Sequence, residues 1–268
     1  MNERLSSTVS VSLSADQGGG MIGHLRLARP ERHNALSLAD WQAIPKAIAR
    51  LNDDGARVII VSGDGASFCA GADISEFDVV RKDPASARHY EAANSDAFAA
   101  IRMAAVPTVA AINGFCLGGG FGLAAACDLR IATPKATFGV PAARLGLAYP
   151  VDAMEDIVNG VGLQAAKRLL FTAERIDAEH ALRLGFLSEI VEVDRLEDKA
   201  LTVAGTIASL APLTHRATKA TLAALTKSAA GDALERAKDV GDVTFDSQDY
   251  AEGRRAFREK RPAIFKGI

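Results

Sequence analysis

Five glycines fall within nine residues, from Gly114 to Gly122, directly before an apolar stretch. Glycine allows backbone angles and close approaches that other residues do not. Where glycines open a helix, unpaired N–H groups point at whatever binds there and favour negative charge. No acid or base follows at once, so the segment could bind a ligand through its backbone. Close packing of the helix is the structural alternative.

Two nucleotide-binding motifs also place glycines at a helix start, and the spacing fits neither of them. A phosphate-binding loop continues with Gly-Lys-Ser/Thr, whereas Phe121, Gly122 and Leu123 follow here. A dinucleotide fingerprint needs GxGxxG and an acidic residue about twenty positions later. Asp128 comes too early for that role.

A second segment of small residues, GDGASFCAGADISEF (63–77), directly follows the short buried strand expected at RVIIVSG. Another strand, PTVAAING, leads into the glycine-rich segment. Two such loops, each leaving a strand, could each donate one N–H group to a single ligand oxygen. That arrangement is an oxyanion hole.

Four motifs and the C-terminal segment carry a resemblance to a known family. They are RPERHNALS (29–37), FCAGADISEF (68–77), NGFCLGGGFGLAAACDLRIA (113–132), FGVPAARLGL (138–147) and YAEGRRAFREKRPAIF (250–265). In this order they resemble the crotonase, or enoyl-CoA hydratase/isomerase, superfamily over nearly the whole chain. The resemblance implies an acyl-CoA thioester as substrate, with no further cofactor and no metal.

The resemblance also implies the residues of the site. The amides of Ala72 and Gly119 would bind the thioester oxygen, and a helix N-terminus at Gly119 would favour a developing enolate. Further substrate contacts are expected from Arg32, Ala35, Ala70, Asp73, Ile74, Phe257 and Lys260.

The basic tail is the expected contact for the CoA phosphates. Residues 251–268 hold six basic and two acidic side chains, and family members often clamp these phosphates from a neighbouring subunit. Phe257 and Lys260 are the expected contacts there, with Arg29 and Arg32 as further contributors. A solvated basic helix end is the structural alternative.

Two positions depart from the pattern of the family's hydratases, which use two glutamates to hold and shuttle water. Gly122 and Ala142 stand at those positions. Neither residue can transfer a proton, and general acid–base catalysis contributes roughly 10²–10⁴-fold. The resemblance implies hydration, whereas these two residues argue against the usual hydration mechanism.

Tyr149 is the most interesting remaining candidate for chemistry. LGLAYP, VEVDRLEDKAL and FDSQDYAEG resemble the family's methylmalonyl-CoA decarboxylases, which have a tyrosine at this loop position. Those enzymes have a histidine where this chain has Ala72, so the match is incomplete. Tyr149 could equally line the acyl pocket.

Other reactive side chains have a structural interpretation. We expect a loop or helix-cap carboxylate at Asp152, a structural pair at Asp128, a surface side chain at His89, and packing roles for Cys69 and Cys116.

The elements expected around these motifs alternate between strands and helices, which indicates an α/β fold with a parallel sheet. TVSVSL and MIGHLRLA predict a hairpin. SLADWQAIPKAIARLN predicts a helix capped by Ser37, which Pro45 should kink or interrupt. DAEHALRLG predicts a helix capped by Asp177 and closed by Gly185.

The expected architecture is the crotonase spiral of ββα turns. Its core with the acyl-CoA site spans residues 1–200, and residues 201–268 form a helical oligomerisation region. The resemblance implies a homotrimer or a dimer of trimers.

Composition narrows the class of protein. The chain has 268 residues, a net charge of −2 and 49% hydrophobic residues, which indicates an ordinary globular protein and gives no support to nucleic-acid binding. We expect no export signal and no membrane span. Three cysteines without a CxxC pair fit a reduced, cytoplasmic compartment.

Three functions stay open at this point. The first is an enzyme of the enoyl-CoA hydratase/isomerase type, active in fatty acid metabolism, that stabilises a thioester enolate. The second is an acyl-CoA decarboxylase or hydrolase that uses Tyr149 or water. The third is a non-catalytic acyl-CoA-binding protein that kept the pocket and lost the acids.

Overall fold

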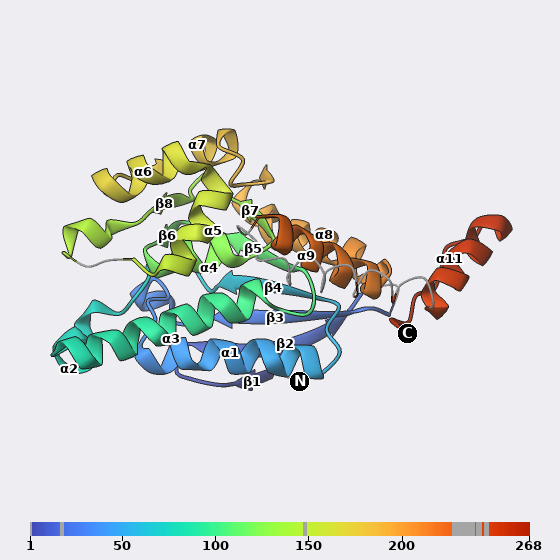
Figure 1. Ribbon diagram of the computed structural model, residues 1–268, viewed down its shortest axis with the longest axis horizontal. Coiled ribbons are helices and arrows are strands. Elements are labelled where there is room, and N and C mark those ends of the chain that lie inside the picture. Colours follow the sequence, from blue (N-terminus) through green and yellow to red (C-terminus); the bar gives the residue numbers. More distant parts are fainter. Residues whose placement is uncertain (1, 17–18, 147–148, 227–238, 240–242, 244–246) are drawn as a thin grey trace.

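The larger of two β-sheets contains the predicted strands in a mixed arrangement (Figure 1). The structure is a computed structural model that describes residues 2–16, 19–146, 149–226, 239, 243 and 247–268, without the side chains of Asn2, Arg254 and Phe257. The strand order is β1-β2-β3-β4-β5-β7-β10. These strands are β1 (Asn2–Arg4), β2 (Val9–Ala15), β3 (Met21–Leu27), β4 (Val58–Gly63), β5 (Thr108–Ile112), β7 (Leu129–Ala132) and β10 (Glu189–Ile190).

The pairing confirms the predicted hairpin and the predicted parallel sheet. β2 and β3 are antiparallel, whereas β3, β4, β5, β7 and β10 pair in parallel. The sequence analysis missed β1, which pairs with β2 at the edge of the sheet. A second sheet of three strands contains β6 (Phe115–Leu117), β8 (Thr137–Gly139) and β9 (Ile176–Asp177).

Helices follow most of the strands. The α-helices are α1 (Leu38–Asp53), α2 (Phe77–Val80), α3 (Pro84–Arg102), α4 (Gly119–Ala126), α5 (Val151–Val161), α6 (Leu163–Thr172), α7 (Ala178–Arg183), α8 (Leu196–Ser209), α9 (Pro212–Thr226) and α11 (Gln248–Glu259). Short 3-10 helices are η1 (Pro30–Arg32), η2 (Ile74–Glu76), η3 (Pro141–Arg144) and η4 (Val193–Arg195).

Helix α1 confirms the predicted cap and corrects the expected interruption. The Ser37 side chain accepts a hydrogen bond from the Asp40 amide, and Asp40 returns the contact to the Ser37 amide, which is a capping box. The helix continues through Pro45 to Asp53. Pro45 removes one intrahelical hydrogen bond, yet Trp41, Ile44 and the other apolar residues of this face are buried in the core, and packing outweighs that loss.

Two hydrophobic clusters lie on opposite faces of the larger sheet. The main cluster joins the sheet to α1, α3, α4 and α5. The smaller one packs Ala200, Ala204 and Ala208 of α8 against Ile22, Val58 and their neighbours in the sheet. Helix α8 therefore covers one face of the sheet, and the boundary expected at residue 200 falls inside this helix.

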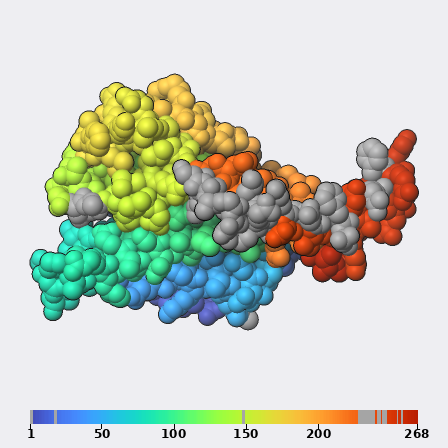
Figure 2. All heavy atoms as spheres, viewed as in Figure 1, coloured from blue at the N-terminus to red at the C-terminus, as the bar shows by residue number. Residues whose placement is uncertain are grey.

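Helix α11 extends from the body of the molecule (Figure 1). Figure 2 shows the red C-terminal residues reaching away from the rest of the protein at one end. Asp249 and Glu252 of α11 hold the last residues through the amides of Ile264, Lys266 and Gly267. Within the described ranges, no helix is long and apolar enough to cross a membrane.

Candidate active site

The two glycine-rich segments predicted to share a ligand run side by side. Cys69 and Cys116 form a parallel bridge, in which the Cys69 amide donates to Phe115 O (2.8 Å) and the Leu117 amide donates to Cys69 O (3.0 Å). A Cβ atom on Gly71, whose φ is +100°, would lie 3.1 Å from the Gly119 amide nitrogen. The segments that follow strands β4 and β5 therefore meet at Gly71 and Gly119.

Both amides expected to form the oxyanion hole are free at this meeting point. Leu36 N–H donates to Gly71 O and Asp73 N–H donates to Leu36 O, both at 2.8 Å. Along such an extended segment the Ala72 amide points the opposite way. Gly119 is the first residue of α4, so its amide has no intrahelical acceptor. Among the described residues neither the Ala72 nor the Gly119 amide has a hydrogen-bond partner.

Close packing explains why glycine occupies these positions. A Cβ atom on Gly119 would lie 2.6 Å from Cη2 of Trp41, and one on Gly120 would lie 2.2 Å from Cys69 O. Gly118, with φ +52°, ends β6 and turns the chain into α4. The same glycines therefore allow close packing of the helix and leave an amide exposed to the pocket, so close packing and ligand binding are compatible.

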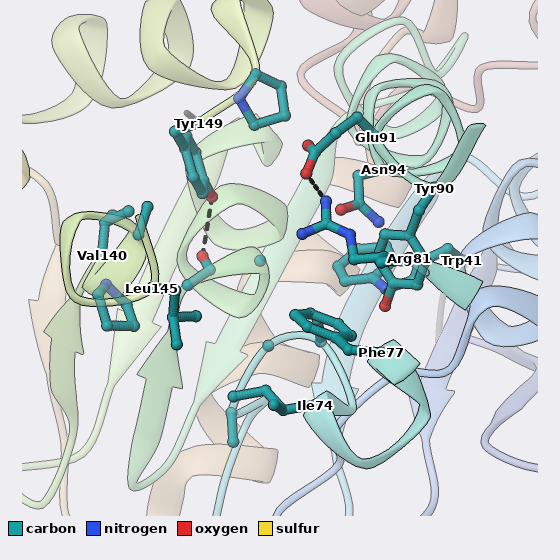
Figure 3. Close-up of a pocket in the computed structure, with 18 of the residues that line it drawn as sticks. Trp41, Ile74, Phe77, Arg81, Tyr90, Glu91, Asn94, Val140, Leu145 and Tyr149 are labelled. Atoms are coloured by element: carbon teal, nitrogen blue, oxygen red, sulfur yellow. Dashed lines mark hydrogen bonds and ion pairs between the residues drawn. The ribbon is translucent and has the colours of Figure 1, made fainter. Parts of the chain in front are cut away.

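A cavity of about 90 Å³ opens beside the two amides (Figure 3). Its walls come from α1, the segment 70–81, helix α3, the start of α4, and residues 140–145 and 149–150. The lining residues are Trp41, Ala70, Gly71, Ala72, Ile74, Phe77, Arg81, Tyr90, Glu91, Asn94, Phe98, Gly118, Gly119, Val140, Pro141, Ala142, Leu145, Tyr149 and Pro150. Most of these side chains are apolar, as is usual for a small-molecule site.

Tyr149 fills the space beside Gly122. Its hydroxyl donates a hydrogen bond to Gly118 O at 2.9 Å, and its ring stacks on Phe98. A Cβ atom on Gly122 would lie 2.6 Å from Tyr149 Oη and 2.8 Å from the Phe98 ring. Burial raises the pKa of Tyr149 far above its ordinary value, so the hydroxyl is protonated at neutral pH and acts as a donor.

The pocket also holds a polar cluster that the sequence analysis missed. The Arg81 guanidinium forms an ion pair with Glu91 and lies over the rings of Phe77 (4.8 Å) and Tyr90 (4.7 Å). Arg81 Nε and Asn94 Nδ2 are buried and have no hydrogen-bond partner in the part of the chain that the structure describes. A buried donor without a partner costs about 1–3 kcal/mol. Glu91 is the only carboxylate among the described residues that line this cavity.

A helical repeat is the sequence signal that could have identified part of this cluster. Tyr90, Asn94 and Phe98 are four residues apart on α3 and share one buried face. An asparagine within an otherwise apolar helical stripe requires a polar partner. Arg81 carried no such signal, because its ion-pair partner Glu91 and the ring of Tyr90 lie on a different helix, α3.

The predicted substrate contacts divide into two groups. Ala70, Ala72, Ile74, Gly119 and Tyr149 line the cavity, together with Ala142. Four others do not line it. Arg32 is exposed, Ala35 lies in the turn before α1, Asp73 pairs with Arg29 (2.7 Å) and caps η2, and Gly122 lies behind Tyr149.

The C-terminal contacts lie away from this cavity within one chain. Lys260 is exposed and ends α11, and the Phe257 side chain lies outside the described residues. Arg255 and Arg261 pair with Glu252, and Arg261 also pairs with Glu259. These pairs neutralise part of the positive charge of the tail. A clamp on CoA from a neighbouring subunit stays a prediction.

The other reactive side chains have structural surroundings. Asp128 accepts from the Thr108 amide and hydroxyl and pairs with Lys219, and Asp152 pairs with Arg102 and accepts from Ser95. His89 is exposed on α3.

Cys69 and Cys116 are fully buried beneath the two glycine-rich segments. Burial raises the pKa of the Cys69 thiol to about 12, so it is not a thiolate at neutral pH.

Comparisons with known proteins agree with this geometry. The family model described as enoyl-CoA hydratase/isomerase matches residues 17–267. A crotonyl-CoA hydratase from Syntrophomonas wolfei is 36% identical, over 90% of this chain and 93% of that protein. A methylmalonyl-CoA decarboxylase from Escherichia coli is 33% identical, over 87% and 90%.

The fold agrees as well. A crystal structure of an enoyl-CoA hydratase/isomerase family protein from Hyphomonas neptunium matches with a TM-score of 0.91 and 35% identity, covering 99% of this chain and all of that one. This likeness confirms the fold class predicted from the sequence. With a family model that spans most of the chain and relatives above 30% identity, the chain belongs to the enoyl-CoA hydratase/isomerase family.

Proposed function

We propose that the protein binds an acyl-CoA thioester and stabilises its enolate through the amides of Ala72 and Gly119. The observation that carries this proposal is the pair of unpartnered amides at one end of an apolar cavity. Two N–H groups and the N-terminus of α4 favour negative charge on the thioester oxygen. Because the donors are fixed by the paired segments around Cys69 and Cys116, little reorganisation accompanies the formation of the enolate.

A change in the ligand tests this proposal more cleanly than a change in the protein, because any side chain at Gly119 meets Trp41. S-butyl-CoA is a thioether that lacks the carbonyl oxygen of butyryl-CoA. Two hydrogen bonds of about 0.5–1.5 kcal/mol each correspond to about 5- to 150-fold in affinity. We therefore expect calorimetry to show that butyryl-CoA binds at least about fivefold more tightly than S-butyl-CoA. Equal affinities for butyryl-CoA and S-butyl-CoA would contradict the proposed oxyanion hole.

Decarboxylation is the second candidate, and the observation that favours it is Tyr149 beside Gly122. Loss of CO₂ breaks the bond between the α-carbon and the carboxylate, and the electron pair enters the enolate. No base takes part in that step. A proton then returns to the α-carbon, and the protonated Tyr149 hydroxyl is our candidate donor. One relative, the enzyme from Escherichia coli, carries the name of such a decarboxylase.

The two reactions separate in a side-by-side assay of crotonyl-CoA and methylmalonyl-CoA. If each missing glutamate is worth roughly 10²–10⁴-fold, hydration should be close to background. Turnover of methylmalonyl-CoA that falls in Tyr149→Phe, with thioester affinity unchanged, would support decarboxylation. Hydration of crotonyl-CoA at about 10 s⁻¹, an ordinary enzymatic rate, would contradict the expected loss of hydratase activity. Turnover of neither thioester, with both bound tightly, would favour the non-catalytic alternative.

A further inference from the structure

The polar cluster of Arg81, Glu91 and Asn94 has more donors than acceptors. Arginine offers five N–H donors. Glu91 engages Nη2 of Arg81, and Nε is buried with no partner. The amide of Asn94, a residue that is 8% exposed, likewise has an unpartnered Nδ2 atom. Of the three buried side-chain atoms without partners in the described part of the chain, two therefore belong to the wall of one cavity.

The cluster is held in place and directed inward. The Arg81 guanidinium lies over two aromatic rings, which fixes its plane. Its side chain is 10% exposed, whereas that of Glu91 is 31% exposed, so the cation is the inner partner of the ion pair. In Figure 3 the guanidinium points toward the open centre of the pocket, across from Tyr149, with Asn94 beside it.

We propose that Arg81 and Asn94 bind a carboxylate carried by the acyl group, so that the substrate is a CoA thioester of a short dicarboxylic acid. A carboxylate accepts several hydrogen bonds at once and matches the fork of a guanidinium. An alkyl chain in this place would leave both donors unsatisfied. This inference names the substrate class of the proposed acyl-CoA site and rests on that function.

The size of the cavity sets the length of the acyl group. A cavity of about 150 Å³ holds benzene, so one of about 90 Å³ suits a short group. A carboxylate held by a cation is also stabilised as the anion. It therefore serves as a handle for recognition, and the enolate chemistry takes place at the thioester end of the same pocket.

Three thioesters of equal length test the inference. Succinyl-CoA carries a carboxylate, 3-hydroxybutyryl-CoA a neutral hydroxyl, and butyryl-CoA neither. One charge-assisted hydrogen bond is worth tenfold or more in affinity. We expect calorimetry on the full-length protein to show succinyl-CoA binding at least tenfold more tightly than butyryl-CoA. Malonyl-CoA and propionyl-CoA repeat the comparison with one carbon fewer.

Arg81→Met and Glu91→Gln should change the preference for succinyl-CoA over butyryl-CoA in opposite directions. Arg81→Met should remove this preference. Glu91→Gln leaves the guanidinium without its competing carboxylate, so we expect succinyl-CoA to bind more tightly by about tenfold while butyryl-CoA is unaffected. Asn94→Leu, similar in size, should weaken succinyl-CoA alone. A purely structural cluster would instead weaken all thioesters together in every variant.

The outcomes separate this inference from the proposed function. If butyryl-CoA binds and neither dicarboxylic thioester binds better than its partner, the carboxylate site is wrong and the acyl-CoA site stands. A hydroxyl that binds as well as the carboxylate would also overturn the inference. If none of the five thioesters binds, both proposals fail.

Discussion

Gly122 is a position where a glycine inside a helix is required by its neighbours. Replacement of a helical glycine by alanine usually stabilises a protein by about 0.5–1 kcal/mol. At Gly122 the new Cβ atom would lie 2.6 Å from Tyr149 Oη and 2.8 Å from the Phe98 ring. We therefore expect Gly122→Ala to destabilise the fold by about 1–3 kcal/mol, as overpacking does, measured by urea denaturation.

Gly205 in α8 is the matched control. Among the described residues, the Cβ of Asp16, at 4.0 Å, is the only atom near a Cβ atom built there, so Gly205→Ala should stabilise the protein. Adding Tyr149→Ala to Gly122→Ala should recover part of the lost stability. A stabilising effect of Gly122→Ala alone would show that Tyr149 and Phe98 move aside easily. The pocket could then also accept a glutamate at this position.

At the level of single residues, the sequence indicated the backbone part of the site better than its side chains. Clustered glycines mark a backbone that must come close to another group, and so Gly119 and the loop before Ala72 could be found. Arg81 and Asn94 could not, since a charged or amide residue is usually solvated. Their importance depends on burial against Phe77, Tyr90 and one another, which is set by the tertiary fold.

Helices α3 and α5 are joined by one arginine that pairs with two carboxylates. Arg102 contacts Asp152 at 3.0 Å and Asp156 at 2.8 Å. Removing the cation leaves two acids unpaired, one of them only 7% exposed. We expect Arg102→Met to cost about 3–5 kcal/mol at pH 7.5. Arg168→Met, which breaks the more exposed pair with Glu174, should cost less than about 1 kcal/mol.

The ion pair between Arg102 and Asp156 makes the stability lost in Arg102→Met depend on pH. Burial raises the pKa of Asp156 to about 6 despite Arg102, so the folded state binds a proton more readily than the unfolded chain. A raised carboxyl pKa means that the contribution of Asp156 to stability falls as the pH rises from about 4 through 6. Without Arg102 the folded pKa rises further. Urea denaturation of Arg102→Met should therefore show a smaller loss at pH 5 than at pH 7.5, and an equal loss would contradict this account.

At the level of elements, the sequence predicted the hairpin, the strands β4 and β5 and the helices α1 and α7, whereas it did not predict β6, β8, β9, α3 or α5. Alternation of apolar residues and buried runs identified the hairpin and the parallel strands, and Ser37 and Asp177 marked two helix starts. The expected interruption of α1 at Pro45 does not occur, because tertiary packing of the helix outweighs the missing hydrogen bond. The sequence also did not indicate β1, because three polar residues at a sheet edge have no pattern of their own.

At the level of the whole molecule, the proposed contact for the nucleotide part of CoA is Lys260. Lys260 lies at the end of α11, away from the cavity of its own chain. If a neighbouring subunit supplies it, Lys260→Glu should weaken acyl-CoA binding roughly tenfold, with little effect on an acyl-pantetheine that lacks the nucleotide. Light scattering should show a trimer or hexamer in both proteins.

Lys46→Glu is the control for a change of surface charge, because Lys46 is exposed on α1. It should leave the affinity for both ligands unchanged. Equal weakening of acyl-CoA and acyl-pantetheine in Lys260→Glu would point to a role in folding or assembly. A monomer in light scattering would rule out a clamp from a second chain.

The chain's single tryptophan lies against Gly119, whose amide is one of the two proposed to bind the thioester oxygen. Trp41 is fully buried, lines the cavity and donates its indole N–H to Tyr90 Oη at 3.0 Å. All indole fluorescence of the unlabelled protein therefore originates at the candidate site. A thioester that displaces solvent there changes the polarity around one fluorophore only. Its arrival can then be followed in real time, without a dye and without turnover.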